Sequence, residues 1–385
     1  MELYIHIPFC VRKCRYCDFL SFASDACVRE KYVDQLIREI ESIPEEDAGQ
    51  CPENAAPRLN LTGRTVETIF IGGGTPSLLP PSAVERILAA VRQVFRVEPD
   101  AEITMEANPG TLTPDSAAGY RNAGVSRLSL GLQSASEEEL RLLGRIHTRE
   151  QFLQSFRAAR DAGFDNINVD LMSALPGQSE ESWQETLRFV CDLEPEHISA
   201  YSLIIEEGTP FASRTLKLPD EDTEYNMYEA TAQILGEYGF EQYEISNYAK
   251  KGRECRHNVG YWIRQDYLGF GLGASSLYGK ERFANTQDMK KYLENSRTPE
   301  KIREKEPLLT REDEMAEFMF LGLRMTRGIS KAEFERQFGS ETDAIYGDVL
   351  RKYKSMGLLL EENGRIFLSR EGIHVSNSVM ADFLP

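Results

Sequence analysis

Short runs of apolar and β-branched residues alternate with helical stretches along the first half of the chain, and this alternation constrains the fold more than any other feature. Each run is bounded by Gly, Pro, Asn or Asp, which is typical of strands in repeated βα units. The six predicted strands lie at residues 3–6, 68–71, 103–107, 128–132, 167–171 and 198–203. Because no clear seventh or eighth unit follows, the pattern predicts an α/β fold with a partial (β/α)6 parallel barrel. Such a barrel binds its ligands at the carboxyl ends of the strands, where the βα loops meet.

The helical stretches carry signals of their own. Apolar residues recur at spacings of three and four over residues 81–95, which predicts a crossover helix with one apolar face against the sheet. Ser136 begins a Ser-x-x-Glu capping box, and Thr113 precedes a helix-initiating proline. Near the C-terminus, Asn363-Gly364 predicts a tight β-hairpin.

These signals divide the chain into three regions. Residues 1–221 hold the predicted barrel, and within them residues 44–64 are rich in Pro, Asn, Ala, Gly and Glu, which predicts an exposed insertion loop. Residues 222–306 form an aromatic-rich connecting region. Residues 307–385 combine helices with one hairpin, and we expect a smaller α+β domain, similar to a winged helix, that closes the barrel mouth as a lid.

Charge and composition exclude two classes of partner. The formal net charge of −18 opposes binding to nucleic acid or anionic lipid, because both attract basic surfaces. The hairpin region is itself acidic in places, which argues against DNA binding. The N-terminal segment lacks the features of a secretory signal, and no apolar run approaches about 18 residues, so we expect a cytoplasmic protein without a membrane span.

Three cysteines, Cys10, Cys14 and Cys17, stand in one short loop after the first predicted strand. Three thiolates at this spacing can bind a 4Fe–4S cluster and leave its fourth iron open for chemistry. A structural zinc ion normally takes four protein ligands, and the only further candidate nearby in sequence is His6. We expect His6 to pack under the cluster instead.

The remaining cysteines have no metal-binding spacing. The total of seven is odd, and the crowding of three into eight positions suits metal ligation in a reducing compartment better than a disulfide framework. Cys27 and Cys191 fall in predicted helices, where we expect small buried hydrophobic residues, and Cys51 lies in the predicted loop.

A glycine-rich turn, Gly72-Gly73-Gly74-Thr75-Pro76, follows the second predicted strand. Successive glycines let the backbone approach a ligand closely and expose its amides. Polar residues also stand at or just beyond the ends of later strands, namely Glu106, Gln133, Arg145 and Asp170. The carboxyl ends of parallel strands converge, so these residues and the cysteine loop are predicted to form one ligand site.

The cysteine spacing, with Tyr16 just before the last cysteine, resembles the radical S-adenosylmethionine (SAM) superfamily. The similarity to its oxygen-independent coproporphyrinogen III oxidase-like group extends over nearly the whole chain. The resemblance implies that SAM chelates the open iron and that an electron from the cluster cleaves it to a 5′-deoxyadenosyl radical. It also implies the residues that contact SAM and the cluster: Tyr4, Gly73, Gly74, Thr75, Glu106, Gln133, Arg145 and Asp170, with Tyr16 beside the cluster and Ile204 and Leu277 as apolar contacts.

Two branches of that group differ in features visible here. The oxidase carries a longer N-terminal extension and a further cysteine two positions past the motif, whereas Asp18 and Phe19 follow the third cysteine in this chain. The chain resembles instead the HemW-type haem chaperones, which share a His-Asn-x-x-Tyr-Trp haem motif. Its residues here are His257, Asn258, Tyr261 and Trp262.

The chemistry of this segment suits haem. A neutral imidazole at His257 can ligate iron, and Cys255 is an alternative thiolate ligand. Tyr261 and Trp262 offer flat apolar faces to a macrocycle, and Arg256 can pair with a propionate.

The resemblance therefore implies a protein that binds haem and transfers it to acceptor haemoproteins, such as respiratory ones, with the help of its cluster and SAM. The alternative is a radical SAM enzyme that decarboxylates coproporphyrinogen III or modifies another porphyrin. The sequence leaves open whether SAM is cleaved or only bound.

Overall fold

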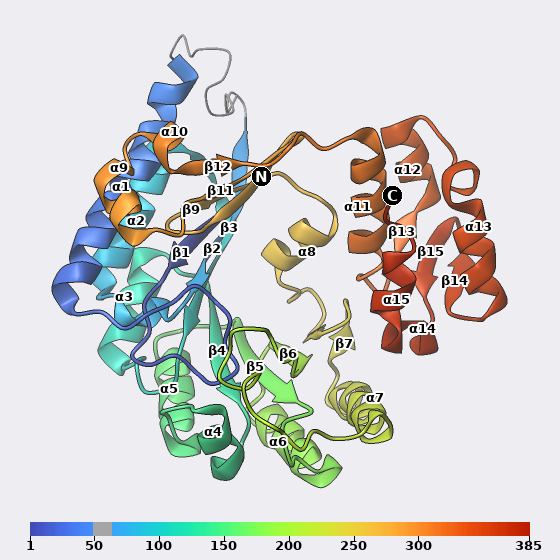
Figure 1. Cartoon of the computed structure of the whole chain (residues 1–385). Helices are drawn as coiled ribbons and strands as arrows, with labels where there is room; N and C mark the ends of the chain where they lie inside the picture. Colours follow the sequence, from blue (N-terminus) through green and yellow to red (C-terminus); the bar gives the residue numbers. More distant parts are fainter. Residues whose placement is uncertain (49–63) are drawn as a thin grey trace.

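The computed structural model describes residues 1–48 and 64–385 and is built on one 12-stranded sheet (Figure 1). Six parallel strands in chain order form its centre. They are β1 (Glu2–Ile7), β2 (Thr65–Gly73), β3 (Arg96–Ala107), β4 (Arg127–Gln133), β5 (Ile167–Ser173) and β6 (His197–Ser202). These are the six predicted strands, so the expected α/β fold with a parallel βα core is confirmed.

Helices connect the parallel strands, as the βα pattern predicted. They are α1 (Ala26–Ala48), α2 (Pro81–Val94), α3 (Pro114–Ala123), α4 (Glu137–Leu143), α5 (Arg149–Asp161), α6 (Glu180–Cys191) and, after β6, α7 (Glu221–Glu237). A short 3-10 turn, η1 (Pro76–Leu78), follows β2. Both predicted N-caps are present, because the Thr113 hydroxyl accepts a hydrogen bond from the Ser116 amide and the Ser136 hydroxyl accepts one from the Glu139 amide. The predicted capping box at Ser136 is not complete, since Glu139 accepts from the Ser134 hydroxyl and the Ser136 amide donates to that hydroxyl instead of to Glu139.

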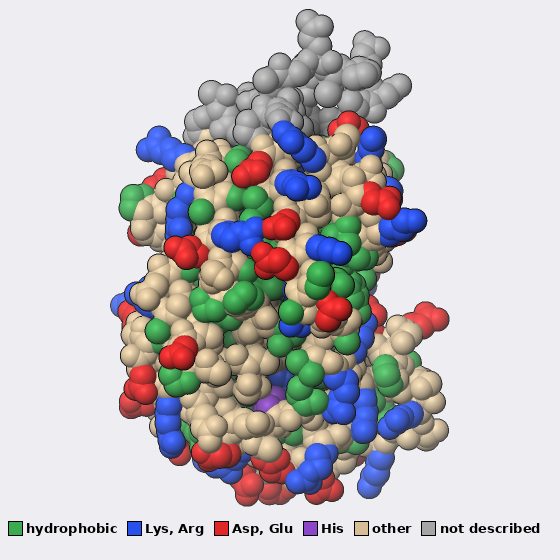
Figure 2. Space-filling model, turned by 90° about the vertical axis from the view of Figure 1, so that its left-hand side faces the viewer, with side chains coloured by type: hydrophobic (Ala, Val, Ile, Leu, Met, Phe, Trp, Pro, Cys, Tyr) green, Lys and Arg blue, Asp and Glu red, His purple; other side chains and the backbone are tan. Residues whose placement is uncertain are grey.

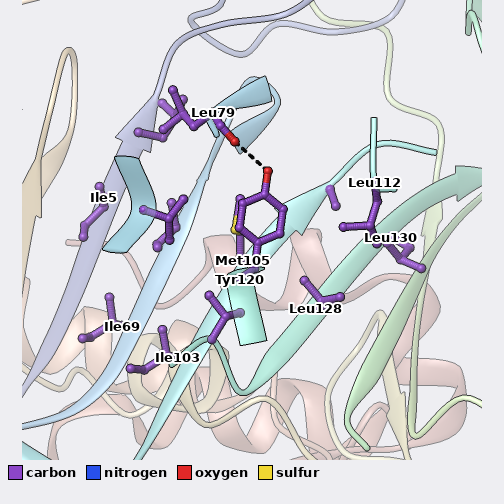
Figure 3. Close-up of a cluster of buried hydrophobic side chains, with 14 of the residues drawn as sticks. Ile5, Ile69, Leu79, Ile103, Met105, Leu112, Tyr120, Leu128 and Leu130 are labelled. Carbon is purple, nitrogen blue, oxygen red and sulfur yellow. Dashed lines mark hydrogen bonds between the residues drawn. The ribbon is translucent and has the colours of Figure 1, made fainter. Parts of the chain in front are cut away.

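The apolar faces of strands and helices meet in one continuous core (Figure 3). Ile5, Ile69 and Ile103 come from the neighbouring strands β1, β2 and β3 and are buried. From α3, Tyr120 reaches across this core and donates a hydrogen bond of 2.6 Å to the Leu79 carbonyl oxygen. This bond fixes the turn that follows β2, because a buried tyrosine hydroxyl needs a partner.

Residues after α7 extend the sheet at both edges. On one side lie β8 (Asn247–Ala249), antiparallel to β6, and β7 (Glu241–Gln242). On the other side β9 (Tyr267–Phe270) pairs parallel with β1 and is followed outward by β10 (Ser275–Tyr278), β11 (Glu281–Asn285) and β12 (Arg303–Lys305). The intervening helices are α8 (Arg256–Trp262), α9 (Met289–Asn295) and α10 (Pro299–Ile302).

The C-terminal residues have a second apolar core and a three-stranded sheet. The elements are α11 (Arg311–Gly322), β13 (Ile329–Ser330), α12 (Lys331–Phe338), α13 (Thr342–Ser355), β14 (Leu359–Glu362), β15 (Arg365–Leu368), α14 (Arg370–His374) and α15 (Ser376–Ala381). Asn363 and Gly364 both have positive φ angles at the turn between β14 and β15, so the predicted hairpin is confirmed. Figure 1 shows α8 between the main sheet and this C-terminal domain.

Two local expectations were wrong. Helix α1 continues through Pro44 to Ala48, so the first five residues of the predicted loop at 44–64 are helical, since the Glu and Ala residues after Pro44 favour a helix. Most of the remainder, Cys51 included, lies outside the described residues. Cys27 is exposed near the start of α1, whereas Cys191 is buried as expected.

The surface carries charges of both signs (Figure 2). On the face shown in Figure 2, acidic and basic side chains are interspersed with each other. Within the described ranges, none of the helices combines the length and apolarity that crossing a bilayer requires.

Candidate functional site

The carboxyl ends of β2 to β5 and the loop after β1 surround one cavity. Most of the residues predicted to hold the cluster and SAM line it. They are Cys10, Cys14, Tyr16, Cys17, Gly73, Gly74, Thr75, Glu106, Gln133, Arg145 and Asp170. The structure therefore brings together side chains from segments as far apart as β1 and β5 at the strand ends, where a parallel βα core binds ligands.

Backbone hydrogen bonds hold the cysteine loop over this cavity. The Cys10 amide donates to the Phe22 carbonyl oxygen at 3.1 Å, and the Arg15 amide donates to that of Leu143 at 3.0 Å. All three thiols are partly exposed. Within the described ranges, no set of three or more His, Cys, Asp or Glu side chains is arranged to hold a single metal ion. Three thiol groups on one loop match the three thiolates that hold a cubane cluster with one iron left open.

Two polar groups point at these sulfur atoms. The Thr75 hydroxyl donates to Cys10 Sγ at 3.5 Å, and the Arg145 guanidinium donates to Cys14 Sγ at 3.7 Å. Donors of this kind stabilise thiolates, which are the form that binds metal. The donor set therefore fits a cluster.

The glycine-rich turn lies tightly against the start of the cysteine loop. Gly73 has φ +111°, and its amide donates to Glu106 Oε2 at 2.9 Å. A Cβ atom on Gly74 would come within 2.6 Å of the Phe9 carbonyl oxygen. The His6 ring lies against Gly73, and its Nε2 atom is 2.9 Å from the Leu20 carbonyl oxygen.

The charged side chains of the cavity leave capacity for a ligand. Burial, together with repulsion from Asp170, raises the pKa of Glu106 to about 8. Arg145 donates to the Asn108 side chain and to the Gly131 carbonyl oxygen, both at 2.6 Å, but its buried Nε has no partner. Gln133 has φ +74°, which is strained for a residue with a side chain. Two carboxyl groups beside an arginine donor without a partner suit a ligand such as SAM, which has a zwitterionic amino-acid group and a cationic sulfonium.

Three of the predicted SAM contacts lie away from the cavity wall. Tyr4 lies behind it, where its hydroxyl is 3.0 Å from His6 Nδ1. Ile204 is 65% exposed in the loop after β6, and Leu277 is buried in β10. Sequence reasoning missed Asn108, whose amide donates to Thr75 Oγ1 at 2.7 Å and whose oxygen accepts from Arg145. Its position two residues past Glu106, at the end of β3, was the available signal.

The predicted haem motif forms α8, and His257 is turned into the barrel. Its side chain is 1% exposed, with Nδ1 at 2.7 Å from Thr68 Oγ1 and Nε2 at 3.0 Å from the Tyr261 hydroxyl. The ring also stacks on Phe70, with 5.2 Å between centroids. Burial lowers the pKa of His257 to about 3, so the imidazole is neutral, but both of its nitrogen atoms are engaged.

The other residues of this segment lie on different faces of α8. Cys255 is buried, its Sγ lies 3.6 Å from Glu102 Oε1, and burial raises the pKa of its thiol to about 12. The Arg324 guanidinium lies over the Trp262 ring at 4.3 Å, and Asn258 is half-buried. The motif is thus one helix wedged between the sheet and the C-terminal domain, rather than a set of side chains facing one ligand.

A second cavity of about 800 Å³ lies beside α8, at the amino-terminal ends of the central strands. Its wall includes Arg256, Val259, Gly260 and Ile263 of α8. The wall also includes residues from β1 to β3, the loop before α8 and the turn after α11, among them Glu2, Glu67, Thr68, Asp100, Glu102, Tyr243, Arg253, Met325 and Arg327. Its volume is in the range of small-molecule sites, which is about 300–1,000 Å³.

Glu2 is a buried carboxyl group at this cavity whose Oε2 has no hydrogen-bond partner. Burial raises its pKa from 4.5 to about 9. The folded protein therefore binds more protons than the unfolded chain between these values, so stability falls as pH rises through this window. We expect Glu2→Gln to raise the free energy of unfolding by up to about 5 kcal/mol at pH 8, about 1.4 kcal/mol for each pH unit above 4.5, and to have little effect at pH 4.5. Denaturant titrations at both pH values measure this difference.

The matched control is Glu67→Gln, because Glu67 is a half-exposed carboxylate on the same cavity and accepts a hydrogen bond from Gln265. This variant should not gain stability at pH 8. Equal unfolding free energies for Glu2→Gln and the wild type at pH 8 would contradict the assignment of Glu2 as a costly buried acid.

Comparison with known proteins agrees with this arrangement. The model of the radical SAM superfamily matches residues 4–190, and that of the HemN C-terminal domain matches residues 309–375. The protein named "Heme chaperone HemW" from Lactococcus lactis subsp. lactis is 34% identical over 385 residues, which cover 99% of this chain and 96% of that protein. The protein of the same name from Escherichia coli is 38% identical over 391 residues, which cover 96% of each chain.

Among solved structures, coproporphyrinogen III oxidase (HemN) from Escherichia coli matches with a TM-score of 0.83. The match covers 99% of this chain and 89% of that one at 24% sequence identity, and it shows a common fold. The two relatives described above, which match over nearly their full length, establish the family. The chain belongs to the HemW-type group of the radical SAM superfamily.

Proposed function

We propose that this chain is a cytosolic haem chaperone that binds haem beside α8 and transfers it to acceptor haemoproteins, with a 4Fe–4S cluster and SAM bound at the other end of the barrel. Membership of the superfamily implies the cluster and SAM, and the names of the full-length relatives point to haem. The observation that carries the proposal is the cavity of about 800 Å³ along α8, the helix formed by the haem motif.

The wall of this cavity has the chemistry that a haem needs. Val259, Ile263 and Met325 supply apolar contacts, and the Met325 thioether is a further potential iron ligand. The Arg256 guanidinium donates to the Asp100 carbonyl oxygen at 2.9 Å. Neither Arg256 nor Arg327 forms an ion pair with a carboxylate of the described residues. In a chain of net charge −18, two such arginines on one cavity suit the propionates of haem.

Neither His257 nor Cys255 lines the cavity, but their protonation favours His257 over Cys255 as the axial ligand. A ligating imidazole must be neutral, and burial keeps His257 neutral, whereas the Cys255 thiol is held in its protonated form. His257 must first release Thr68 or Tyr261, because both of its ring nitrogens are hydrogen-bonded. A shift of α8 away from β2 would separate His257 from Thr68 and free Nδ1 for iron.

The separation between the two sites favours a carrier over an enzyme that acts on a porphyrin at α8. Thr68, which contacts His257, and Gly73, in the glycine-rich turn, are five residues apart on β2. At about 3.3 Å per residue this is about 16 Å, too far for direct reaction between bound SAM and a macrocycle beside α8. When bound and reduced, the cluster supplies electrons for radical chemistry at its own end of the barrel. The residues of this chain there bind and orient SAM.

A haem titration of anaerobically reconstituted protein tests the proposal. We expect a Soret band distinct from that of free haem, weaker haem binding by about tenfold in the Arg256→Ala/Arg327→Ala double variant, and loss of the ligand-dependent band shift in His257→Ala. Arg336→Ala is the matched control, because Arg336 is exposed on α12 and pairs with Glu333. Mixing the haem-loaded protein with an acceptor apo-haemoprotein should convert the spectrum to that of the acceptor. A spectrum of free haem throughout the titration would overturn the proposal.

A further inference from the structure

A chain of hydrogen bonds runs through the interior of the barrel and joins α8 to the cavity lined by Cys10, Cys14 and Cys17. The Cys255 amide, at the N-cap of α8, donates to the Tyr243 hydroxyl at 3.3 Å. The same hydroxyl is 2.8 Å from His197 Nε2, and His197 Nδ1 is 2.6 Å from Asn168 Oδ1. The Asn168 amide donates to Asp170 Oδ1 at 2.8 Å. Except for Asp170, which is half-buried, these residues are buried or nearly so.

The direction of every hydrogen bond in this chain follows from its two ends. The Asp170 carboxylate accepts from the Asn168 amide, so the Asn168 oxygen must accept from His197 Nδ1. Burial lowers the pKa of His197, so the ring is neutral and its Nε2 is an acceptor. Tyr243 must therefore donate to Nε2 while it accepts from the Cys255 amide. The donors all point from α8 towards Asp170.

Each end of the chain faces one of the two cavities. Tyr243 lines the 800 Å³ cavity beside α8, and Asp170 lines the cavity that also holds the cysteines. Ser129 strengthens the second end, because its hydroxyl accepts from Asn168 and donates to Asp170 Oδ2 at 2.9 Å. Both oxygen atoms of Asp170 are thus oriented by groups that depend on Asn168.

We propose that Tyr243, His197 and Asn168 are positioning residues that fix the Asp170 carboxylate for SAM and couple its orientation to the position of α8, so that haem and SAM change each other's affinity. The inference rests on the proposed function, since it takes haem beside α8 and SAM beside Asp170. The element that moves in this proposal is α8, because its shift away from β2 separates His257 from Thr68. A shift of its N-cap removes the Cys255 donor from Tyr243 and allows the hydroxyl to turn away from His197. Linkage then requires the effect of haem on SAM affinity to equal that of SAM on haem affinity.

Tyr243→Phe tests this inference, because it removes the central hydroxyl and little volume. In the wild type we expect haem to change the dissociation constant of SAM by at least about fivefold, with an equal reciprocal effect. In the variant we expect SAM alone to bind about two- to tenfold more weakly, because one buried hydrogen bond is lost. We also expect the linkage between SAM and haem to vanish. Equilibrium dialysis measures both constants, and the change in the electron paramagnetic resonance spectrum of the reduced cluster on adding SAM provides a readout independent of turnover.

Tyr353→Phe is the matched control. Tyr353 is 5% exposed in α13, and its hydroxyl is hydrogen-bonded to Asp382 outside the network, so this variant should keep the wild-type linkage. His197→Asn is a second variant that breaks the network at a different point. Its side-chain amide can keep the hydrogen bond to Asn168 but is too short to reach Tyr243. It should weaken SAM binding no more than Tyr243→Phe does and should likewise lose the linkage with haem.

The outcomes separate the two proposals. A wild type that binds no haem removes the proposed function, while the SAM affinity of Tyr243→Phe still tests the positioning role. A wild type that binds both ligands, with the same SAM affinity and the same linkage in Tyr243→Phe, overturns the inference and leaves the proposed function intact.

Discussion

Replacing Cys14 with alanine is expected to abolish binding of the iron–sulfur cluster. Cys10, Cys14 and Cys17 are the three thiols that line the cavity, and the described residues offer no other cysteine there. A cubane held by two thiolates has two exposed irons and is lost to chelation and hydrolysis. After anaerobic reconstitution, iron and sulfide analysis should fall to near background, and the reduced protein should show no cluster signal by electron paramagnetic resonance.

Cys27→Ala is the matched control, because Cys27 is an exposed thiol near the start of α1 that does not line the cavity. Its iron content should equal that of the wild type. Retention of a full cluster in Cys14→Ala would show that another ligand completes the site and would undo the assignment of the three-cysteine loop.

The parts of this fold that depend on local sequence could be predicted. Strands β1 to β6 are short β-branched runs whose position follows from their composition, and the caps at Thr113 and Ser136 act within one helical turn. The convergence of Glu106 and Asp170 also followed, because parallel strands in chain order place their carboxyl ends together.

The parts that depend on distant contacts could not be predicted. Strand β9 is only four residues long, and its pairing with β1 joins segments more than 260 residues apart. His257 lies buried against β2, where Thr68, 189 residues away in sequence, is hydrogen-bonded to its Nδ1. Its residue type and motif spacing suggested haem chemistry but contained no information about which way the ring points.

The chain of side chains from Cys255 to Asp170 was hidden for the same reason. Each member is an ordinary residue in sequence, and Tyr243, His197 and Asn168 come from three separate segments. Only the pairing of β5 with β6, and of β6 with β8, brings these segments together. Sequence patterns therefore indicated the residues at the two ends of this path, the segment that forms α8 and Asp170. Only the structure shows the hydrogen bonds that connect them.

Substitution of Gly74 by alanine is expected to weaken SAM binding by more than about a hundredfold. The added Cβ would lie 2.6 Å from the Phe9 carbonyl oxygen and 2.8 Å from the Phe9 amide nitrogen. These are backbone atoms directly before Cys10, so relief of the clash requires the glycine-rich turn and the cysteine loop to separate. Such a separation also strains the hydrogen bond of 2.9 Å from the Gly74 amide to the Ile7 carbonyl oxygen. Because the turn and the loop both line the cavity, a shift of about 1 Å between them misplaces the SAM contacts relative to the cluster site.

Equilibrium dialysis with SAM, together with iron analysis of the same sample, distinguishes loss of SAM binding from loss of the cluster. Gly236→Ala is the control, since Gly236 lies within α7 and a Cβ there meets no atom within 4 Å. That variant should bind SAM like the wild type and be slightly more stable, because alanine favours a helix. Unchanged SAM affinity in Gly74→Ala would mean that the turn does not form the wall of the SAM site, and the ligand would then have to be held by the carboxylate and arginine side chains alone.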